Sequence, residues 1–390
     1  MSPNALPFSD ETRFFTPMAW LRTLLRVTDP WLFGVVLALL AISWTMIVSA
    51  GPDRLESLQT HIALALVLML ATAVIPLRHI VRIAPILYLL GVLLLIAVAL
   101  FGDVSKGARR WLDIGVTRIQ PSELMKLAVP LALAWYFQQR ENALRAHDFI
   151  IAFVLLGIPV ALIAMQPDLG TALLVTAAGL YVIFFAGLPW KLIIPAVLLA
   201  IGGLLAILGF GDILCAPEFD WVVLHEYQKQ RICTLLDPSQ DPLGRGFHVI
   251  QSTIAIGSGG MWGKGWLEGT QTHLAFIPER HTDFIFSVLC EEFGFVGVLV
   301  LIALYILLIG RGMTITATAT TFAGRLLAGA ITMIFFTYAF VNMGMVSGIL
   351  PVVGVPLPFI SYGGTSLVSL CIAVGLLMNI RHHSRLIAQG

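Results

Sequence analysis

Six apolar runs, each at least 19 residues long, limit most strongly what this chain can fold into. About 20 apolar residues are enough for an α-helix to cross the hydrocarbon core of a bilayer. The six runs are residues 31–50, 83–101, 192–210, 284–309, 322–346 and 360–378. Four shorter or more polar runs also fit spanning helices, namely 61–75, 123–137, 149–164 and 171–186. The pattern predicts an all-α polytopic membrane protein with about ten transmembrane helices.

The composition excludes a water-soluble domain. Hydrophobic residues make up 58% of the 390 residues and charged residues only 12%, whereas soluble domains carry roughly 25% charged residues. The net charge of +1 gives no electrostatic signal for nucleic acid. We expect one transmembrane domain over residues 29–385, between an N-terminal tail of residues 1–28 and a C-terminal tail of residues 386–390. No small-residue cleavage site follows the N-terminal arginines, so we expect a cytoplasmic tail and not a signal peptide.

The Lys and Arg residues of the short loops indicate the orientation, because cytoplasmic loops carry an excess of them. With the N-terminus inside, the inner side collects Arg13, Arg22, Arg26, Arg78, Arg82, Arg140, Arg145, Lys191, Arg311, Arg325, Arg381 and Arg385. The outer side collects only Arg54, Lys106, Arg109, Arg110 and Arg118. Both termini are therefore expected in the cytoplasm, and the long loop of residues 211–282, between helices 7 and 8, outside. Cys215 and Cys233 lie in this loop, where a disulfide is possible.

The outer loop of residues 102–120 is unusually basic. Lys106, Arg109 and Arg110 lie beside Trp111 in KGARRWLDIG. One interpretation is a solvated loop with an interfacial tryptophan, which is common in membrane proteins. The other, which we favour, is a site in which arginines hold an anionic headgroup and the indole forms a platform for a sugar or lipid.

Charged residues also occur within or beside predicted spans. Glu123 and Lys126 are three residues apart, so they share a helix face and are expected to form an ion pair that lowers the cost of burying each charge. A structural role for this pair is favoured over a catalytic one. Asp168, in a very short outer turn, either caps the following helix or binds a cation or a substrate hydroxyl.

Glycine clusters mark the long outer loop. Residues 244–246 and 257–260 read GRG and GSGG, which indicates bends or close backbone approach. With Arg231, Arg245 and Lys264 nearby, the loop is either a set of turns or a cradle for a phosphate or pyrophosphate. Residues 247–256 are expected to form a short amphipathic helix on the membrane surface.

A proline-rich outer turn, residues 350–358, cannot form a regular helix. Irregular backbone at membrane depth is tolerated only inside protein or along a cavity. The turn leads into SYGGTS, which begins at Ser361. These small and hydroxylated residues suit either close approach of a substrate or tight helix packing.

The central candidate is the polar segment PERHTD, which runs directly into the apolar run 284–309. It places Glu279, Arg280, His281 and Asp283 at the expected outer membrane surface, with Asp283 where the chain enters lipid. From the residues alone, Asp283 is equally a helix cap or a reactive carboxylate.

Together these motifs resemble the SEDS family (shape, elongation, division and sporulation). The resemblance rests on GARRWLDIG with QPSELMKLA, QPDLGTAL, GFHVIQSTIAIGSGGMWGKG, FIPERHTDFIFSVLCEEFGFVG and GILPVVGVPLPFISYGGTSL. It implies a peptidoglycan glycosyltransferase that polymerises lipid II into glycan strands during cell elongation, at the outer face of the bacterial cytoplasmic (inner) membrane. The family's essential aspartate matches Asp283, its loop tryptophan matches Trp111, and its intramembrane charged pair matches Glu123 and Lys126. The implied partners are a class B penicillin-binding protein, a PBP2-like transpeptidase, and other membrane proteins of the elongation complex.

The implied reaction makes Asp283 the general base, which takes a proton from a sugar hydroxyl of the acceptor. The candidates that neutralise the leaving pyrophosphate are Arg109, Arg110, Arg231 and Lys264. A divalent cation, Mg²⁺ or Mn²⁺, would share that work. The other expected substrate-binding residues are Lys106, Trp111, Glu279, Arg280, His281 and Ser361. Two rival functions stay open, a flippase for lipid II and a non-catalytic scaffold of the elongation machinery.

Overall fold

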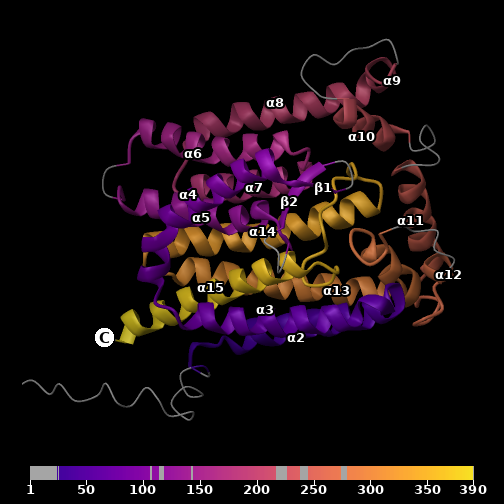
Figure 1. Ribbon diagram of the computed structural model, residues 1–390, viewed down its shortest axis with the longest axis horizontal. Helices are drawn as coiled ribbons and strands as arrows, with labels where there is room; N and C mark the ends of the chain where they lie inside the picture. The colour runs from indigo at the N-terminus through magenta and orange to yellow at the C-terminus, as the bar shows by residue number, and fades with distance from the viewer. Residues whose placement is uncertain are drawn as a thin grey trace, which may run out of the picture.

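The computed structural model describes residues 24, 26–105, 108–113, 118–141, 144–216, 226–237, 245–273 and 279–389. Ten of the described helices have 17 residues or more, and each overlaps one of the ten predicted spans. They are α2 (Pro30–Ala50), α3 (Leu55–Val74), α4 (Leu77–Phe101), α5 (Pro121–Gln138), α6 (Ala146–Met165), α7 (Leu169–Phe185), α8 (Trp190–Gly209), α13 (Ile285–Thr318), α14 (Phe322–Val346) and α15 (Gly364–Gln389). The long helices run roughly side by side as one bundle (Figure 1).

Within the described ranges, eight helices are long and apolar enough to cross a membrane. Helix α7 is apolar but shorter, and α5 carries Glu123 and Lys126 in its first two turns. The prediction of a helical membrane protein is confirmed. Helix α8 is almost entirely exposed and lies at the edge of the bundle in Figure 1.

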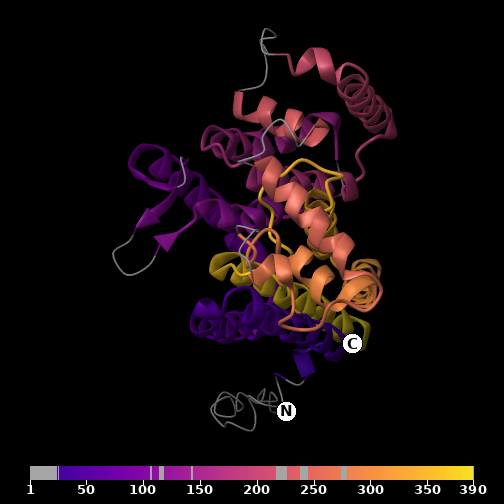
Figure 2. The same cartoon turned by 90° about the vertical axis from the view of Figure 1, so that its right-hand side faces the viewer.

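The loop between α4 and α5 contains a small sheet that the sequence analysis did not predict. Strands β1 (Asp103–Ser105), β2 (Ala108–Asp113) and β3 (Arg118–Ile119) pair antiparallel in the order β1-β2-β3. The sheet projects from the side of the bundle in the end-on view of Figure 2. Strand β2 pairs with β1 at Arg109 and Trp111 and with β3 at Leu112 and Asp113, which holds the backbone around Arg110 in place.

The long loop between α8 and α13 is partly helical. Its helices are α9 (Gly211–Leu214), α10 (Glu226–Leu236), α11 (Arg245–Gly259) and α12 (Thr270–His273). Helix α11 contains the predicted helix of residues 247–256 and crosses the ends of the long helices in Figure 1. Ser252 of α11 donates a hydrogen bond to Val346 O at the end of α14 (2.8 Å). Cys215 and Cys233 form a disulfide with a Cα–Cα distance of 5.7 Å.

Glycines at the end of α11 and shortly after it allow close packing against a kink in α13. Gly294, with φ 61°, interrupts the helical backbone of α13. A Cβ at Gly259 would clash with Cys290 O, and one at Gly263 would clash with Glu292 O. The backbone hydrogen bonds that join the two segments run from Lys264 N to Glu291 O, from Gly265 N to Glu292 O and from Phe295 N to Gly260 O. This packing gives Gly259 and Gly260 of the second glycine cluster a structural role.

Two residues, Asp29 and Asn379, join elements at the opposite end of the bundle, where α2 begins and α15 ends. Asp29, the buried N-cap of α2, accepts from Arg311 Nε (2.9 Å) and pairs with Arg381 Nη1 (2.6 Å). Asn379 of α15 donates to the last carbonyl groups of α3, at Thr72 O (3.1 Å) and Ala73 O (3.0 Å).

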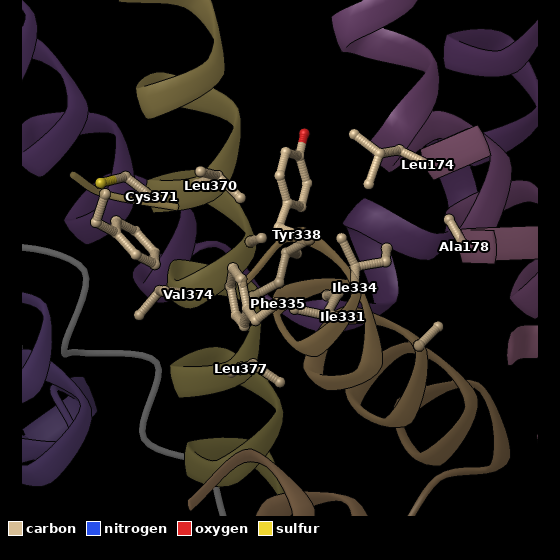
Figure 3. Packing of buried hydrophobic residues seen from close by; sticks show 14 of the residues in the cluster. Leu174, Ala178, Ile331, Ile334, Phe335, Tyr338, Leu370, Cys371, Val374 and Leu377 are labelled. Atoms are coloured by element: carbon tan, nitrogen blue, oxygen red, sulfur yellow. The ribbon is translucent and has the colours of Figure 1, made fainter. Parts of the chain in front are cut away.

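Helices α14 and α15 form the centre of the apolar core. In Figure 3, Val374 and Leu377 of α15 face Ile331 and Phe335 of α14, and all four are buried. Tyr338 continues the same α14 face, with its hydroxyl directed away from this cluster (Figure 3). Beyond the Tyr338 ring, the side chains between the helices are polar and line a cavity.

Candidate active site

A cavity of about 1160 Å³ lies at the end of the bundle that carries the sheet and the long loop. Helices α3, α5, α7 and α15, strands β2 and β3, and the segments before α13 and α15 form its walls. It extends about two turns down α15, from Gly364 to Ile372. The predicted site residues that line it are Arg110, Trp111, Glu123, Lys126, Glu279, His281 and Asp283.

Asp283 lies two residues before the first residue of α13, half-buried in the cavity wall. The N-cap of α13 is Phe284, which makes no side-chain capping bond. Asp283 therefore does not occupy the N-cap position that the alternative interpretation required. Its carboxylate faces Gly354, where a Cβ would lie 3.3 Å from Oδ2. Gly354 has φ 76°, a conformation that favours glycine.

The backbone on either side of Asp283 is held by two buried side chains. Asn342 of α14 donates to Asp283 O (2.9 Å) and to a carbonyl oxygen of the proline-rich turn (2.7 Å). Ser361 accepts from Leu357 N (2.7 Å) and donates to Thr282 O (2.6 Å). Ser361, predicted to bind substrate, therefore joins the proline-rich turn to the Asp283 segment and is not among the residues that line the cavity.

A second wall of the cavity centres on Asp168, the N-cap of α7. Its carboxylate accepts from the backbone N–H (3.3 Å) and the hydroxyl (2.9 Å) of Thr171, so the capping interpretation is confirmed. Gln120 Nε2 donates to the same carboxylate (3.0 Å), and Arg110 Nε lies 4.0 Å from it. Arg110 also donates to Pro167 O (2.6 Å). These contacts fix the Arg110 guanidinium at the cavity wall.

The deeper part of the cavity contains the ion pair expected from the sequence. Lys126 Nζ lies 2.5 Å from Glu123 Oε1, and both side chains are almost completely buried. Ser369 of α15 donates to Glu123 Oε2 (3.3 Å). The Lys126 ammonium lies 5.1 Å from the ring centroid of Tyr338. The pair connects α5 to α14 and α15 beneath the polar rim of the cavity.

A third wall carries residues that the sequence analysis did not assign to the site. Arg54 lies 5.6 Å from the ring centroid of Tyr362, whose hydroxyl hydrogen-bonds to Ser57 (2.6 Å). The rings of His61 and His281 lie 6.3 Å and 5.9 Å from the Tyr362 ring. Burial lowers the pKa of His281 below its ordinary value. Arg54 also pairs with the neighbouring Asp53 (3.2 Å). No local pattern marks Arg54 or His61 as site residues, because Tyr362, which brings them together, lies about 300 residues away in the chain.

Several predicted site residues bond elsewhere. Arg231 donates to Val352 O (3.0 Å), and Arg280 donates to Ala50 O (2.7 Å). Lys264 Nζ lies 2.7 Å from the buried carboxylate of Glu291. None of these three cations is among the residues that line the cavity.

Of the three other basic residues discussed for the site, the structure describes the side chain of Arg109. Arg109 is exposed on β2 and does not line the cavity. Lys106 and the side chain of Arg245 lie outside the described part of the chain. Of the cations predicted to neutralise pyrophosphate, Arg110 alone lines the cavity as described.

Comparisons with known proteins identify the family. The family model described as "Cell cycle protein", for FtsW, RodA and SpoVE, matches residues 22–386. The chain is 50% identical over 365 residues to the peptidoglycan glycosyltransferase MrdB of Escherichia coli (strain K12), covering 93% of this chain and 95% of MrdB. It is 39% identical over 296 residues to a probable peptidoglycan glycosyltransferase FtsW of Geobacter sp. (strain M18), covering 75% and 76%.

Solved structures share the fold. One of them describes the structural coordination of polymerization and crosslinking by a peptidoglycan synthase complex. The matching chain of that complex is 35% identical to this chain, with a TM-score of 0.75, and the match covers 91% of this chain and 98% of the matching chain. The rod shape determining protein RodA of Thermus thermophilus is 29% identical, with a TM-score of 0.65, covering 90% and 96%. The chain therefore belongs to the SEDS family, the family of FtsW, RodA and SpoVE.

Proposed function

We propose that this chain is a peptidoglycan glycosyltransferase of the RodA type, which polymerises lipid II with Asp283 as the general base. The observation that carries the proposal is the position of Asp283. Its side chain lines a cavity of about 1160 Å³ whose other walls supply two arginines, Arg54 and Arg110. This arrangement suits a reaction between two large substrates that each carry a pyrophosphate.

Asp283 lies between the two arginine-bearing walls. On one side, Gly354 packs beside the Asp283 carboxylate and against Gly170. Gly170 lies in the first turn of α7, whose N-cap, Asp168, lies beside Arg110. On the other side, the backbone N–H of Tyr362 donates to His281 O (2.9 Å), next to Arg54. A sugar held near Asp283 therefore has a cation within reach on either side.

The proposed step forms one bond and breaks one. The acceptor hydroxyl oxygen bonds to the anomeric carbon of the donor sugar, and the bond from that carbon to the lipid pyrophosphate breaks. Asp283 takes the hydroxyl proton, and the bonding electron pair leaves with the pyrophosphate. Arginine forks stabilise that charge through charge-assisted hydrogen bonds. A single carboxylate suits direct displacement with inversion, because pyrophosphate needs little help from an acid to leave.

The cavity also has an apolar part that suits a polyprenyl chain. Leu64, Leu124, Leu127, Leu174 and Ile372 line it alongside the polar residues. Its depth along α5 and α15 lets a lipid tail lie among spanning helices while the sugar meets Asp283. This match to an amphiphilic substrate favours lipid II over a soluble sugar nucleotide.

We further propose ten spans with both termini in the cytoplasm, so that the cavity and the loop of residues 211–282 face outward. The excess of Lys and Arg in the inner short loops supports this orientation. So does the disulfide between Cys215 and Cys233, because disulfides persist in oxidising compartments. In this orientation α11 lies across the outer ends of the spans, as expected for a helix at the membrane surface.

The partner that we propose is a class B penicillin-binding protein, a PBP2-like transpeptidase of the elongation complex. The similar chain in the peptidoglycan synthase complex supports it, because that structure concerns polymerization together with crosslinking. A transpeptidase at the outer face would receive the glycan strands where they form.

A divalent cation, Mg²⁺ or Mn²⁺, stays a proposal. Over the described ranges, no three His, Cys, Asp or Glu side chains come together as metal ligands. Mg²⁺ is commonly bound by one or two carboxylates together with substrate phosphates. A cation here would accordingly take most of its ligands from the pyrophosphate, and the proposed proton transfer to Asp283 does not depend on it.

The test compares Asp283→Asn with Glu268→Gln, the same carboxylate-to-amide change at an exposed residue that does not line the cavity. Purified variants are incubated with lipid II in detergent, and glycan products are separated on gels. Because general-base catalysis typically contributes about 10²–10⁴-fold, Asp283→Asn should lose that factor in rate while Glu268→Gln keeps the full rate. A folded Asp283→Asn variant with the normal rate would remove Asp283 from the role of base.

The same assay separates the two rival functions. A lipid II flippase would give no glycan in detergent but would move lipid II across vesicle membranes. A scaffold would do neither, yet would still bind its partner. Long glycan products made by the purified chain would exclude both rivals as its main activity.

A further inference from the structure

A second cavity, of about 210 Å³, lies at the far end of the bundle from Asp283. The starts of α4 and α14 and the ends of α5 and α15 enclose it. Helix α4 begins at this cavity and has 25 residues, so it runs about 37 Å before it reaches the sheet. The two cavities are therefore separate sites at opposite ends of the spanning helices.

The second cavity is lined by cations and by no carboxylate. Arg78, Arg82 and His383 are its ionisable lining residues. The carboxylates near this end that the structure describes are paired with other arginines: Asp148 with Arg140, Asp29 with Arg311 and Arg381, and Glu141 with Arg325. Arg78 and Arg82 are exposed and one helical turn apart, so they repel each other unless an anion lies between them.

Uncharged polar and aromatic groups complete the cavity. Gln138 and Gln139, at the end of α5, and Thr321, the N-cap of α14, supply hydrogen-bond donors. Trp135 adds a half-buried indole, a group that in membrane proteins prefers the level of the lipid headgroups. These groups match the oxygens of a phosphate ester.

An exposed apolar stripe continues from the two arginines along α4. Ile86, Leu89 and Leu93 follow Arg82 at helical spacing and are 68%, 58% and 54% exposed. The same helix face therefore presents charge at its start and an uncovered hydrocarbon surface beyond it. A phospholipid has this order of groups, a charged headgroup followed by acyl chains.

We propose that this cavity binds the phosphate of an anionic phospholipid between Arg78 and Arg82, with the acyl chains along the exposed face of α4. Basic pockets between transmembrane helices are known to hold such headgroups. A zwitterionic headgroup fits less well, because its own cation would meet three basic side chains and no carboxylate. The bound lipid would join α4 and α5 to α14 and α15.

The test titrates the full-length purified protein in detergent with phosphatidylglycerol, and native mass spectrometry counts the bound lipid. Each arginine near an anionic lipid contributes roughly a five-fold factor in affinity. The double variant Arg78→Gln/Arg82→Gln should therefore bind roughly 30-fold more weakly than the wild type. The matched control, Lys191→Gln/Arg145→Gln, removes two exposed cations that do not line the cavity, and it should bind like the wild type.

Two further arms identify the source of the phosphate. Phosphatidylcholine should bind much more weakly than phosphatidylglycerol, and free glycerol 3-phosphate should not compete at millimolar concentration. The proposal is overturned if phosphatidylcholine binds equally, if the free phosphate displaces the lipid, or if the two double variants bind alike. If Arg78→Gln/Arg82→Gln does not fold, the single variants carry the test, with about five-fold effects expected from each.

Discussion

Replacement of Gly354 by alanine is expected to slow glycan polymerisation by moving the Asp283 carboxylate. A Cβ at Gly354 lies 3.3 Å from Asp283 Oδ2, which is closer than ordinary van der Waals contact, so the carboxylate must move by a few tenths of an ångström. A misplacement of about 1 Å can cost roughly 10²-fold in rate. The smaller shift at Gly354 should lower kcat by about 3- to 10-fold.

The substitution also strains the backbone, and a second variant separates the two effects. Gly354 has φ 76°, where an ordinary L-residue costs about 1–2 kcal/mol. Asparagine tolerates this region better than alanine but adds the same Cβ. Gly354→Asn should therefore lose as much rate as Gly354→Ala while keeping a higher melting temperature.

The assay is the initial rate of lipid II polymerisation by purified variants, with thermal unfolding measured in the same detergent. Gly363→Ala is the matched control, since Gly363 also lines the cavity but a Cβ there meets nothing closer than Ser366 Cβ at 3.6 Å. Full activity in Gly354→Ala would refute the reasoning that the carboxylate beside Gly354 is the reacting group. An equal loss in Gly363→Ala would show that the cavity, and not that contact, is sensitive.

Three other perturbations have expected outcomes. Lys126→Met leaves the Glu123 carboxylate buried without its cation and should destabilise the protein by about 3–5 kcal/mol. Adding Glu123→Gln should recover part of the lost melting temperature. No recovery would contradict a direct ion pair between Glu123 and Lys126. Burial lowers the pKa of His281 below its ordinary 6.5; the unfolded chain then binds more protons, so stability should fall as pH drops below about 6.5 and stay level above it. His281→Asn should flatten that profile, and an unchanged slope would assign it to other groups. Reduction of the disulfide between Cys215 and Cys233, which are 18 residues apart, should lower the free energy of unfolding by about 3 kcal/mol, because the loop constraint is lost. A melting temperature insensitive to dithiothreitol would show that other contacts hold the loop.

The helical part of the fold could be predicted because a bilayer imposes a length and a polarity on each span. The predicted run 322–346 coincides with α14, and the predicted surface helix of residues 247–256 lies within α11. The sheet of residues 103–119 was missed. Its strands are short, and the pairing of Asp103 with Trp111 depends on a bulge that no local pattern indicates.

The glycine clusters also show which features the sequence predicts and which need the packing of distant segments. The sequence indicated that backbone comes close to something near residues 257–260, because glycine is the residue that permits such contact. It did not indicate that the partner is the kink at Gly294, more than 30 residues later. The sequence alone therefore leaves both a set of turns and a phosphate cradle open for these residues.

The sequence by itself determined the spans, the Glu123–Lys126 pair and the segment that carries Asp283. Each depends on composition or on the helical repeat within about 20 residues, so local chain geometry is enough to specify it. Only the tertiary structure decided which cations line the same cavity as Asp283. Arg54 and Arg110 line its cavity, while Arg231 and Lys264 bond to backbone or to a buried carboxylate elsewhere. A side chain reaches only a few ångströms, so its partners are chosen by how segments far apart in the chain pack together.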